Sequence, residues 1–353
     1  MSKQREPIAV ISTDWHLRED NIDQIKALAT EQCELTKSLG LNINFCLGDI
    51  FDHRNGQKVS TLVAFGEILE IFHSYKIKLV AIPGNHDKQN YSGFESFIDT
   101  FKHYPGFLYI ARHGGIPMKE HGVFFHFLPY MKHGTWMGLF QEAMEYIEPL
   151  LGDGNKHVLL SHIAVNGSRN NDGSLVEAGI SVTDFAKFDL VLLGHYHDQQ
   201  QVGKNVFHIP SLQQNNFGEN AEKGFTVFYD DCTFDLVKST FREYEKVVVD
   251  FDKVSKKELE DLTRAYSTVN KNIRFEIRGA ADKVKSLNKQ EIISLGIDVV
   301  VKIKEVEDTI QYADSEIKEY TKTSIVTEFA EFCETKDKSF DIGLEYLTNK
   351  LNK

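Results

Sequence analysis

The chain has 353 residues, 41% of them hydrophobic and 26% charged, and its formal net charge is −12. This length is enough for a sizeable core and predicts two domains, or one large domain with appendages. The negative charge argues against a protein that holds nucleic acid by bulk electrostatics alone, so a nucleic-acid function would need a local basic surface, metal ions or a partner.

The sequence contains no run of about 18 apolar residues, and it therefore predicts no membrane-spanning helix. The apolar run near the N-terminus ends at Asp14 and is too short for a signal peptide. We therefore expect a soluble, cytoplasmic protein without membrane contact.

Short, almost continuously apolar segments alternate with amphipathic stretches over residues 1–225. Such segments are typical of strands covered on both faces. Helices are predicted at 21–39 and at about 58–75, where apolar residues recur on one helical face. This alternation predicts a layered α/β domain with helices outside a sheet. The predicted strands are 8–13, 43–49, 77–83, 122–129, 157–162, 188–195 and 205–210.

The pattern changes after about residue 225. A hairpin is predicted at 225–237, and further strands and a charged helix follow, which together indicate a small α+β domain over 226–311. From residue 312 the chain becomes helical and charged, and ends in an apolar stripe at helical spacing. This stripe consists of Phe340, Leu344, Leu347 and Leu351.

Five short polar motifs follow predicted strands in the first domain. They are Asp14-Trp15-His16, Gly48-Asp49-Ile50-Phe51-Asp52, Gly84-Asn85-His86-Asp87, Ser161-His162 and Gly194-His195-Tyr196-His197. In open α/β sheets, ligands bind at the carboxyl ends of the strands. A single His after a strand is more often a hydrogen-bonded residue than a ligand, so the interpretation depends on the whole set.

Together the motifs offer two first-rank carboxylates, one amide and five imidazoles from one sheet edge. Bringing these groups together without a cation would leave polar groups desolvated or in mutual repulsion, which is costly. Mixed oxygen and imidazole ligands suit manganese, iron or zinc rather than calcium, and the absence of thiolates disfavours a structural zinc site. The set therefore predicts a site for two divalent ions.

The order D-x-H, G-D-x-x-D, G-N-H-D, a lone H and G-H-x-H resembles the calcineurin-like metallophosphoesterases. The resemblance implies a β-sandwich of two sheets flanked by helices, with a dinuclear centre at the strand ends. It implies that one ion binds Asp14, His16 and His197, that the other binds Asn85, His162 and His195, and that Asp49 bridges both. His86 is implied to face the leaving group and the transition state rather than a metal ion.

Chemistry of this kind uses two ions about 3.5–4 Å apart, which clamp a phosphate and activate a water molecule. The charge of the ions offsets the negative charge that develops on the phosphoryl group. His86 would stabilise that charge or protonate the departing oxygen. Asp87 would either orient His86 or a ligand, or serve as a turn residue.

Three features narrow the substrate class: two motif differences, a segment after the last motif, and the organisation of the C-terminal part described below. Phosphoprotein phosphatases of this superfamily carry G-D-x-V-D-R-G and G-N-H-E, whereas this chain has "GDIFDHR" and "GNHD". Residues 209–225, "IPSLQQNNFGENAEKGF", resemble a segment of the SbcD-like DNA repair nuclease subunits. The alternative for this segment is a polar surface loop.

The nuclease resemblance also implies a domain organisation. Residues 1–225 would form the metallophosphoesterase nuclease domain, 226–311 a capping domain that binds DNA, and 312–353 a helical segment that binds an SMC-like ATPase of the SbcC type. The stripe at the C-terminus would dock on a helix of that partner, or pack on its own domain instead. The resemblance further implies a homodimer of the nuclease subunit.

Four more residues are candidates for substrate binding: Asp52, His53, Arg54 and Lys88. Many relatives have His where this chain has Asp52, with His53 beside it, and that position is linked in the family to exonuclease action. The balance between exonuclease and endonuclease activity is therefore open. Single basic residues such as Arg54 and Lys88 are ordinarily solvated surface.

The sequence thus predicts a manganese-dependent DNA nuclease, the catalytic subunit of an SbcCD-like complex in double-strand-break repair, recombination or DNA processing. The alternative is a stand-alone phosphodiesterase or phosphatase that acts on nucleotides or other small phosphoesters. A non-catalytic scaffold would need missing ligands, and every ligand position of the motifs is filled.

Overall fold

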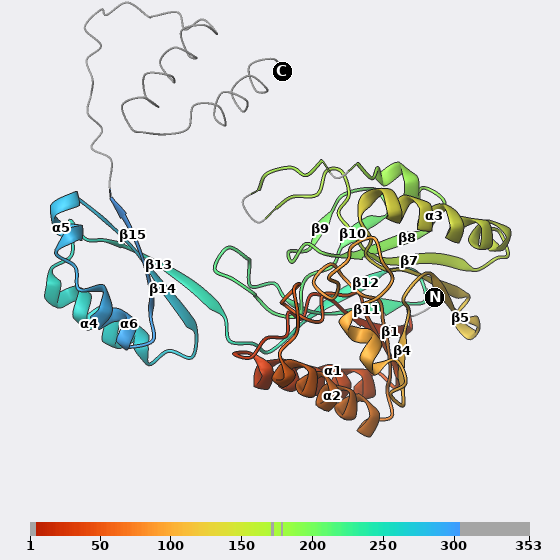
Figure 1. Cartoon of the computed structure of the whole chain (residues 1–353), viewed down its shortest axis with the longest axis horizontal. Helices are drawn as coiled ribbons and strands as arrows, with labels where there is room; N and C mark the ends of the chain where they lie inside the picture. The colour runs from red at the N-terminus through yellow and green to blue at the C-terminus, as the bar shows by residue number, and fades with distance from the viewer. Residues whose placement is uncertain (1–4, 171–172, 178, 304–353) are drawn as a thin grey trace, which may run out of the picture. The chain divides into compact units, whose positions relative to one another are not determined.

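The computed structural model describes residues 5–170, 173–177 and 179–303. In this part of the chain, two six-stranded sheets pack face to face and a three-stranded sheet follows (Figure 1). Among the described residues, no helix is long and apolar enough to cross a membrane. The expected segment 312–353, with Phe340, Leu344, Leu347 and Leu351, lies outside the described residues.

The first sheet has a parallel centre and an antiparallel edge. β1 to β4 run parallel, and β11 pairs antiparallel with β1 and with β12. In sheet order the strands are β12 (Phe234–Lys238), β11 (Gly224–Tyr229), β1 (Pro7–Ser12), β2 (Ile43–Cys46), β3 (Lys78–Ala81) and β4 (Phe107–Tyr109).

The second sheet is also mixed, because β6, β7, β8 and β10 are parallel while β5 and β9 pair antiparallel at its edges. In sheet order the strands are β5 (Gly114–Met118), β6 (Val123–Leu128), β7 (Lys156–His162), β8 (Leu190–Gly194), β10 (Val206–His208) and β9 (Gln200–Gln201).

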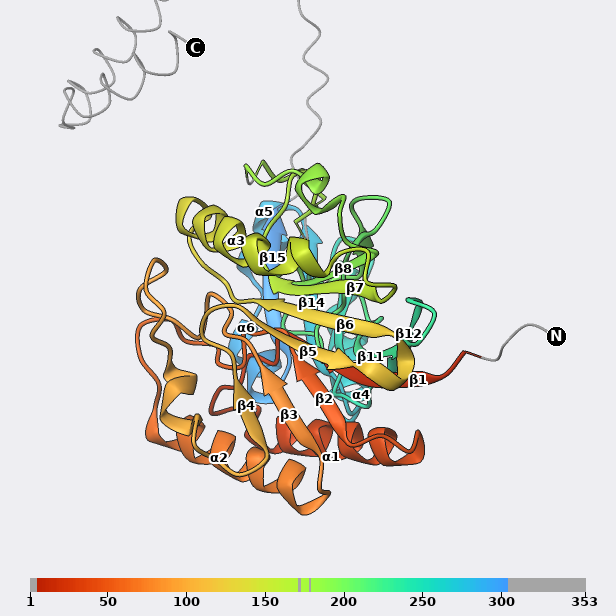
Figure 2. The same cartoon turned by 90° about the vertical axis from the view of Figure 1, so that its right-hand side faces the viewer.

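Helices cover the outer faces of both sheets (Figure 2). α1 (Ile22–Ser38) and α2 (Val59–Ser74) pack on the first sheet, and α3 (His133–Ile147) packs on the second. Short 3₁₀ helices lie at Phe97–Phe101, Lys119–His121, Glu148–Leu150 and Val182–Phe185. The predicted β-sandwich of two mixed sheets flanked by helices is confirmed.

The expected domain boundary at 225/226 falls inside β11. The hairpin of β11 and β12 completes the first sheet, because β11 pairs with β1 over Pro7 to Ile11. Residues 226–238 therefore belong with the first sheet rather than with the small domain. The reason is a long-range strand pairing that no local pattern reveals.

The small domain consists of two successive β-α-β units. β13 (Tyr244–Asp250), β14 (Asn272–Gly279) and β15 (Asp298–Ile303) are all parallel, which differs from the expected α+β arrangement. Helical segments connect successive strands and return the chain to the same end of the sheet. These are α4 (Lys256–Ser267), α5 (Ala281–Lys285) and α6 (Lys289–Ser294).

An aromatic cluster between the two large sheets predicts a measurable loss of stability. Phe45 is fully buried, and its ring lies 4.9 Å from Phe125 and 5.1 Å from Phe127. Phe45→Ala should lower the free energy of unfolding by about 3–5 kcal/mol, because it leaves a cavity. Val63→Ala, at a side chain that is 55% exposed on α2, should change it by less than about 0.5 kcal/mol. Urea denaturation measures both, and equal effects would contradict the assigned core.

Candidate metal centre

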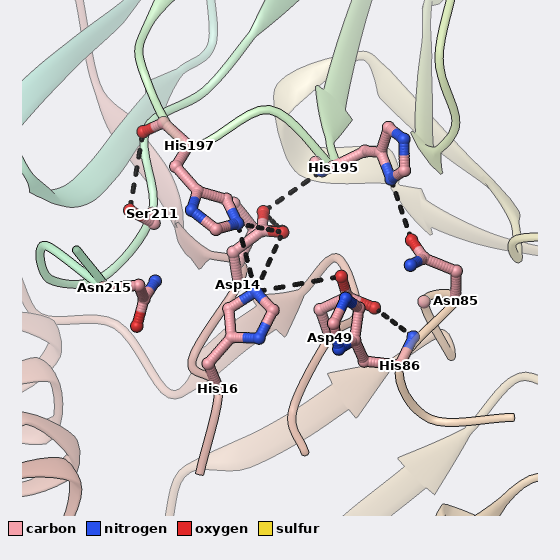
Figure 3. Close-up of polar contacts among 12 residues, drawn as sticks. Asp14, His16, Asp49, Asn85, His86, His195, His197, Ser211 and Asn215 are labelled. Carbon is pink, nitrogen blue, oxygen red and sulfur yellow. Dashed lines mark hydrogen bonds and ion pairs between the residues drawn. The ribbon is translucent and has the colours of Figure 1, made fainter. Parts of the chain in front are cut away.

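The five predicted motifs converge at the carboxyl ends of strands from both sheets. Figure 3 shows residues of four of these motifs. Asp14 and His16 follow β1, Asp49 follows β2, Asn85 and His86 follow β3, His162 ends β7, and His195 and His197 follow β8. Among the residues that the structure describes, three groups of side chains bring potential ligand atoms within 4.8 Å of one another. They are Asp14 with His16 and His197, Asp49 with His162 and His195, and His16 with Asp52 and His86.

The backbone at the convergence point is strained. Of the six non-glycine residues with positive φ in the described part of the chain, four are Asp14, His16, Asp49 and His195, with φ between 48° and 91°. Such conformations cost free energy in L-residues and persist only where the surroundings impose them. Here the amides of Asp14 and His16 donate to the carbonyls of Gly48 and Asp49, at 2.9 and 3.0 Å.

Three glycines allow the strand ends to approach one another. A Cβ on Gly84 would lie 2.1 Å from Asp49 Oδ1, and one on Gly194 would lie 2.3 Å from Thr13 Oγ1. A Cβ on Gly48 would lie 2.5 Å from the amide nitrogen of Gly84. Each glycine directly precedes a potential ligand, so the absence of a side chain is what places that ligand.

The first group fits a divalent cation. Asp14 Oδ1 is buried and has no hydrogen-bond partner among the described residues. It lies 3.6 Å from His197 Nε2 and 3.9 Å from His16 Nε2, and the two ring nitrogens are 3.1 Å apart. A buried acceptor without a partner is costly, and a cation bound among these three atoms would remove that cost.

The second group also combines buried oxygen atoms with imidazoles, and Asp49 lies between the two groups. His162 Nε2 is 3.3 Å from Asp49 Oδ2 and 3.1 Å from Asn85 Oδ1. His195 Nδ1 is 2.8 Å from the same Asn85 oxygen. Asp49 Oδ2 also lies 3.9 Å from His16 Nε2 in the first group, so one carboxylate reaches both.

Burial and charge act in opposite directions on these side chains. Burial favours the neutral acid of Asp49, but the surrounding histidines, foremost His162, outweigh it and hold the pKa of Asp49 well below its usual range. Burial likewise disfavours charged His162, but the Asp49 carboxylate raises its pKa to about 9. Burial and the neighbouring His162 lower the pKa of His195 to about 3.

His86 is held between a donor and an acceptor. Its Nδ1 is 2.5 Å from the carbonyl oxygen of Asp52, and its Nε2 is 2.6 Å from a guanidinium nitrogen of Arg54. A guanidinium only donates and a carbonyl only accepts, so Nδ1 donates and Nε2 accepts. Burial lowers the pKa of His86, consistent with a neutral ring. In this arrangement Nε2 carries no proton for a departing oxygen, and Arg54 supplies the positive charge.

The other candidate substrate contacts divide into two kinds. Arg54 and His53 are exposed, whereas Asp52 turns toward the centre, with Oδ1 3.2 Å from His16 Nδ1. Lys88 requires a correction, because its side chain is fully buried and its ammonium donates to the carbonyls of Gly93 and Tyr130, at 3.2 and 2.9 Å. Lys88 fastens a loop and does not face a substrate.

Two supporting residues were not predicted in these roles. Asp87 accepts hydrogen bonds from the amides of Phe51 and Gly84, at 2.9 and 2.8 Å, and so ties two motif loops together. Glu219 Oε1 lies 2.7 Å from His197 Nδ1. Its place in the segment 209–225 was the available signal, but the separation of the two residues in the sequence hides the contact.

Comparisons with known proteins place the five motifs in a family. Residues 7–199 match the family model described as calcineurin-like phosphoesterase, which spans all five motifs. A crystal structure of a dimetal phosphatase from Danio rerio is similar with a TM-score of 0.44 and 10% sequence identity, over 64% of this chain and 93% of that chain.

The close approach at Gly84 leads to a prediction. Gly84→Ala should lower the free energy of unfolding by about 1–3 kcal/mol, because its Cβ would collide with Asp49. Gly138→Ala is the matched control, since a Cβ on Gly138, inside α3, would meet no atom within 4 Å, and it should raise stability by about 0.5–1 kcal/mol. Urea denaturation of both variants measures the difference, and a neutral Gly84→Ala would refute the tight approach.

Proposed function

Because the chain belongs to the calcineurin-like phosphoesterase family, we propose that it is a two-metal-dependent DNA nuclease. In this proposal it is the catalytic subunit of an SbcCD-like complex in double-strand-break repair, recombination or DNA processing, and manganese is its metal. Metal-dependent hydrolysis of phosphoesters is the general chemistry of the family. The choice of DNA as the substrate is the part that needs support.

One observation carries the choice of DNA. The segment 209–225, which resembles the SbcD-like nuclease subunits, contacts both the centre and the small domain. Glu219 faces His197, while Phe217 packs edge-on against Tyr244 with ring centroids 4.9 Å apart and lies under the guanidinium of Arg274 at 4.1 Å. The segment therefore makes specific contacts with both domains. This argues against the alternative that it is only a polar surface loop.

The proposed roles follow the geometry. Two divalent ions would supply Lewis acidity toward the phosphate and would lower the pKa of water. The ligands of one ion would be Asp14, His16 and His197, and those of the other Asn85, His162 and His195, with Asp49 shared. Arg54 would bind the non-bridging phosphate oxygens. His86 would hold Arg54 in place. To give a proton to the departing oxygen, its Nε2 would have to be released by Arg54 and first take up a proton.

The proposed partners rest on sequence resemblance and on charge. The segment 312–353, with the stripe of Phe340, Leu344, Leu347 and Leu351, would bind an SMC-like ATPase, and the nuclease subunit would form a homodimer. A chain of net charge −12 repels DNA overall. A partner that supplies DNA-binding surface would compensate for this repulsion.

Cleavage of an end-labelled linear DNA duplex tests the substrate class. We expect the full chain with manganese, alone or with its ATPase partner, to shorten the duplex, and a chelator to stop the reaction. Asp49→Asn should lower the rate at least about 100-fold, since it removes the shared ligand. Asp261→Asn, at an exposed position of α4, is the matched control and should leave the rate unchanged. Turnover of nucleotides without any cleavage of DNA, even with the partner, would favour the stand-alone phosphodiesterase or phosphatase.

The contact between Arg54 and His86 predicts that a substitution can lower turnover without lowering manganese binding. His86→Ala should keep manganese binding within about threefold but lower kcat about 100-fold or more, because it removes the ring that holds Arg54 in position. Arg54→Lys should raise KM more than His86→Ala does, since an ammonium cannot bind phosphate oxygens in a bidentate manner. Calorimetric manganese titration and steady-state kinetics measure these effects. Loss of manganese binding in His86→Ala would show that His86 is a ligand.

A further inference from the structure

The two histidines of the first group share a feature at the ring nitrogen that faces away from the ligand cluster. His197 Nδ1 lies 2.7 Å from Glu219 Oε1, and His16 Nδ1 lies 3.2 Å from Asp52 Oδ1. Their Nε2 atoms are the ones that meet near Asp14. Both imidazoles of this group therefore sit between the ligand cluster and a carboxylate.

Glu219 is fixed in this position by its surroundings. Its side chain is fully buried, and Oε1 also accepts a hydrogen bond from Asn216 Nδ2 at 2.7 Å. The other oxygen, Oε2, accepts from the amide of Asn215 at 3.0 Å and lies 3.3 Å from the ammonium of Lys223. Lys223 is itself buried and lies beside Oε2. The other oxygen, Oε1, therefore stays directed at His197.

The second group is supported differently. His162 Nδ1 donates to the carbonyl oxygen of Leu47 at 2.7 Å, which is a neutral partner. His195 uses Nδ1 toward Asn85, within the ligand cluster itself. The carboxylates that support imidazoles from behind are thus concentrated on the first group.

A carboxylate behind a metal-binding imidazole fixes its tautomer, makes the ligating nitrogen more basic and adds negative charge near the ion. Removing such a partner typically weakens metal affinity by about 10–100-fold. We infer that the two ion sites are unequal, that the site of Asp14, His16 and His197 binds a divalent ion more tightly, and that Glu219 is the positioning residue chiefly responsible. The inference rests on the metal centre of the proposed function, but not on DNA as the substrate.

Titration of manganese chloride into the metal-free full-length protein tests the inference by calorimetry and by the manganese electron paramagnetic resonance signal. The wild type should bind two ions in two separable steps. Glu219→Gln should weaken the tighter step by about 10–100-fold and change the weaker step by less than about threefold. Glu219→Asp should fall between the two. Glu222→Gln, at an exposed residue of the same loop that pairs with Lys238, should leave both steps unchanged.

The experiment needs two controls, a test that the variant folds and a variant of Asp52, the second supporting carboxylate. Because Glu219 also holds its own loop, Glu219→Gln must first be shown to fold. Circular dichroism and urea denaturation measure this. If it is not folded, Asp52→Asn tests the same site through His16 and should weaken the same step. Two equal steps in the wild type, or equal weakening of both steps in the variants, would overturn the inference and leave a manganese-dependent nuclease intact. A wild type that binds no manganese would overturn the metal centre itself.

Discussion

The architecture depends on two buried carboxylates that are surrounded by histidines. Asp14 and Asp49 are almost completely excluded from solvent, and a buried carboxylate is unstable unless positive charge or donors surround it. The strand ends of both sheets meet around these two side chains, with glycines where a Cβ would collide. The sandwich can therefore be understood as the frame that brings positive partners and ions to two buried negative charges.

The support of this centre extends into the small domain. Glu219 and Phe217 belong to one short loop, whose Gln214 side chain also accepts a hydrogen bond from the amide of Tyr244 at 2.9 Å. The same loop thus lies behind the potential ligand His197 and contacts β13 and β14.

The sequence predicted much of the fold and the centre because both follow local rules. Apolar runs that end in His, Asp or Asn mark parallel strand ends, and parallel strands place those ends at one edge of each sheet. That the motifs come from two sheets rather than from one sheet edge is visible only in the structure. The missed features depend on distant contacts. The pairing of β11 with β1, the burial of Lys88 and the contact of Glu219 with His197 each join residues whose own neighbours in sequence give no indication of it. A lysine in a polar motif is ordinarily solvated, and only the packed structure reveals the carbonyls that enclose this one.

The left-handed backbone of Asp14, His16, Asp49 and His195 has a consequence for the newly synthesised chain. An unfolded chain rarely adopts such conformations, and the ligand motifs are spread from residue 14 to residue 197. No short nascent segment can therefore assemble the site by itself while translation is under way. Because the potential ligands come from strands of both sheets, an ion that needs all of them can bind only after the two sheets have packed together.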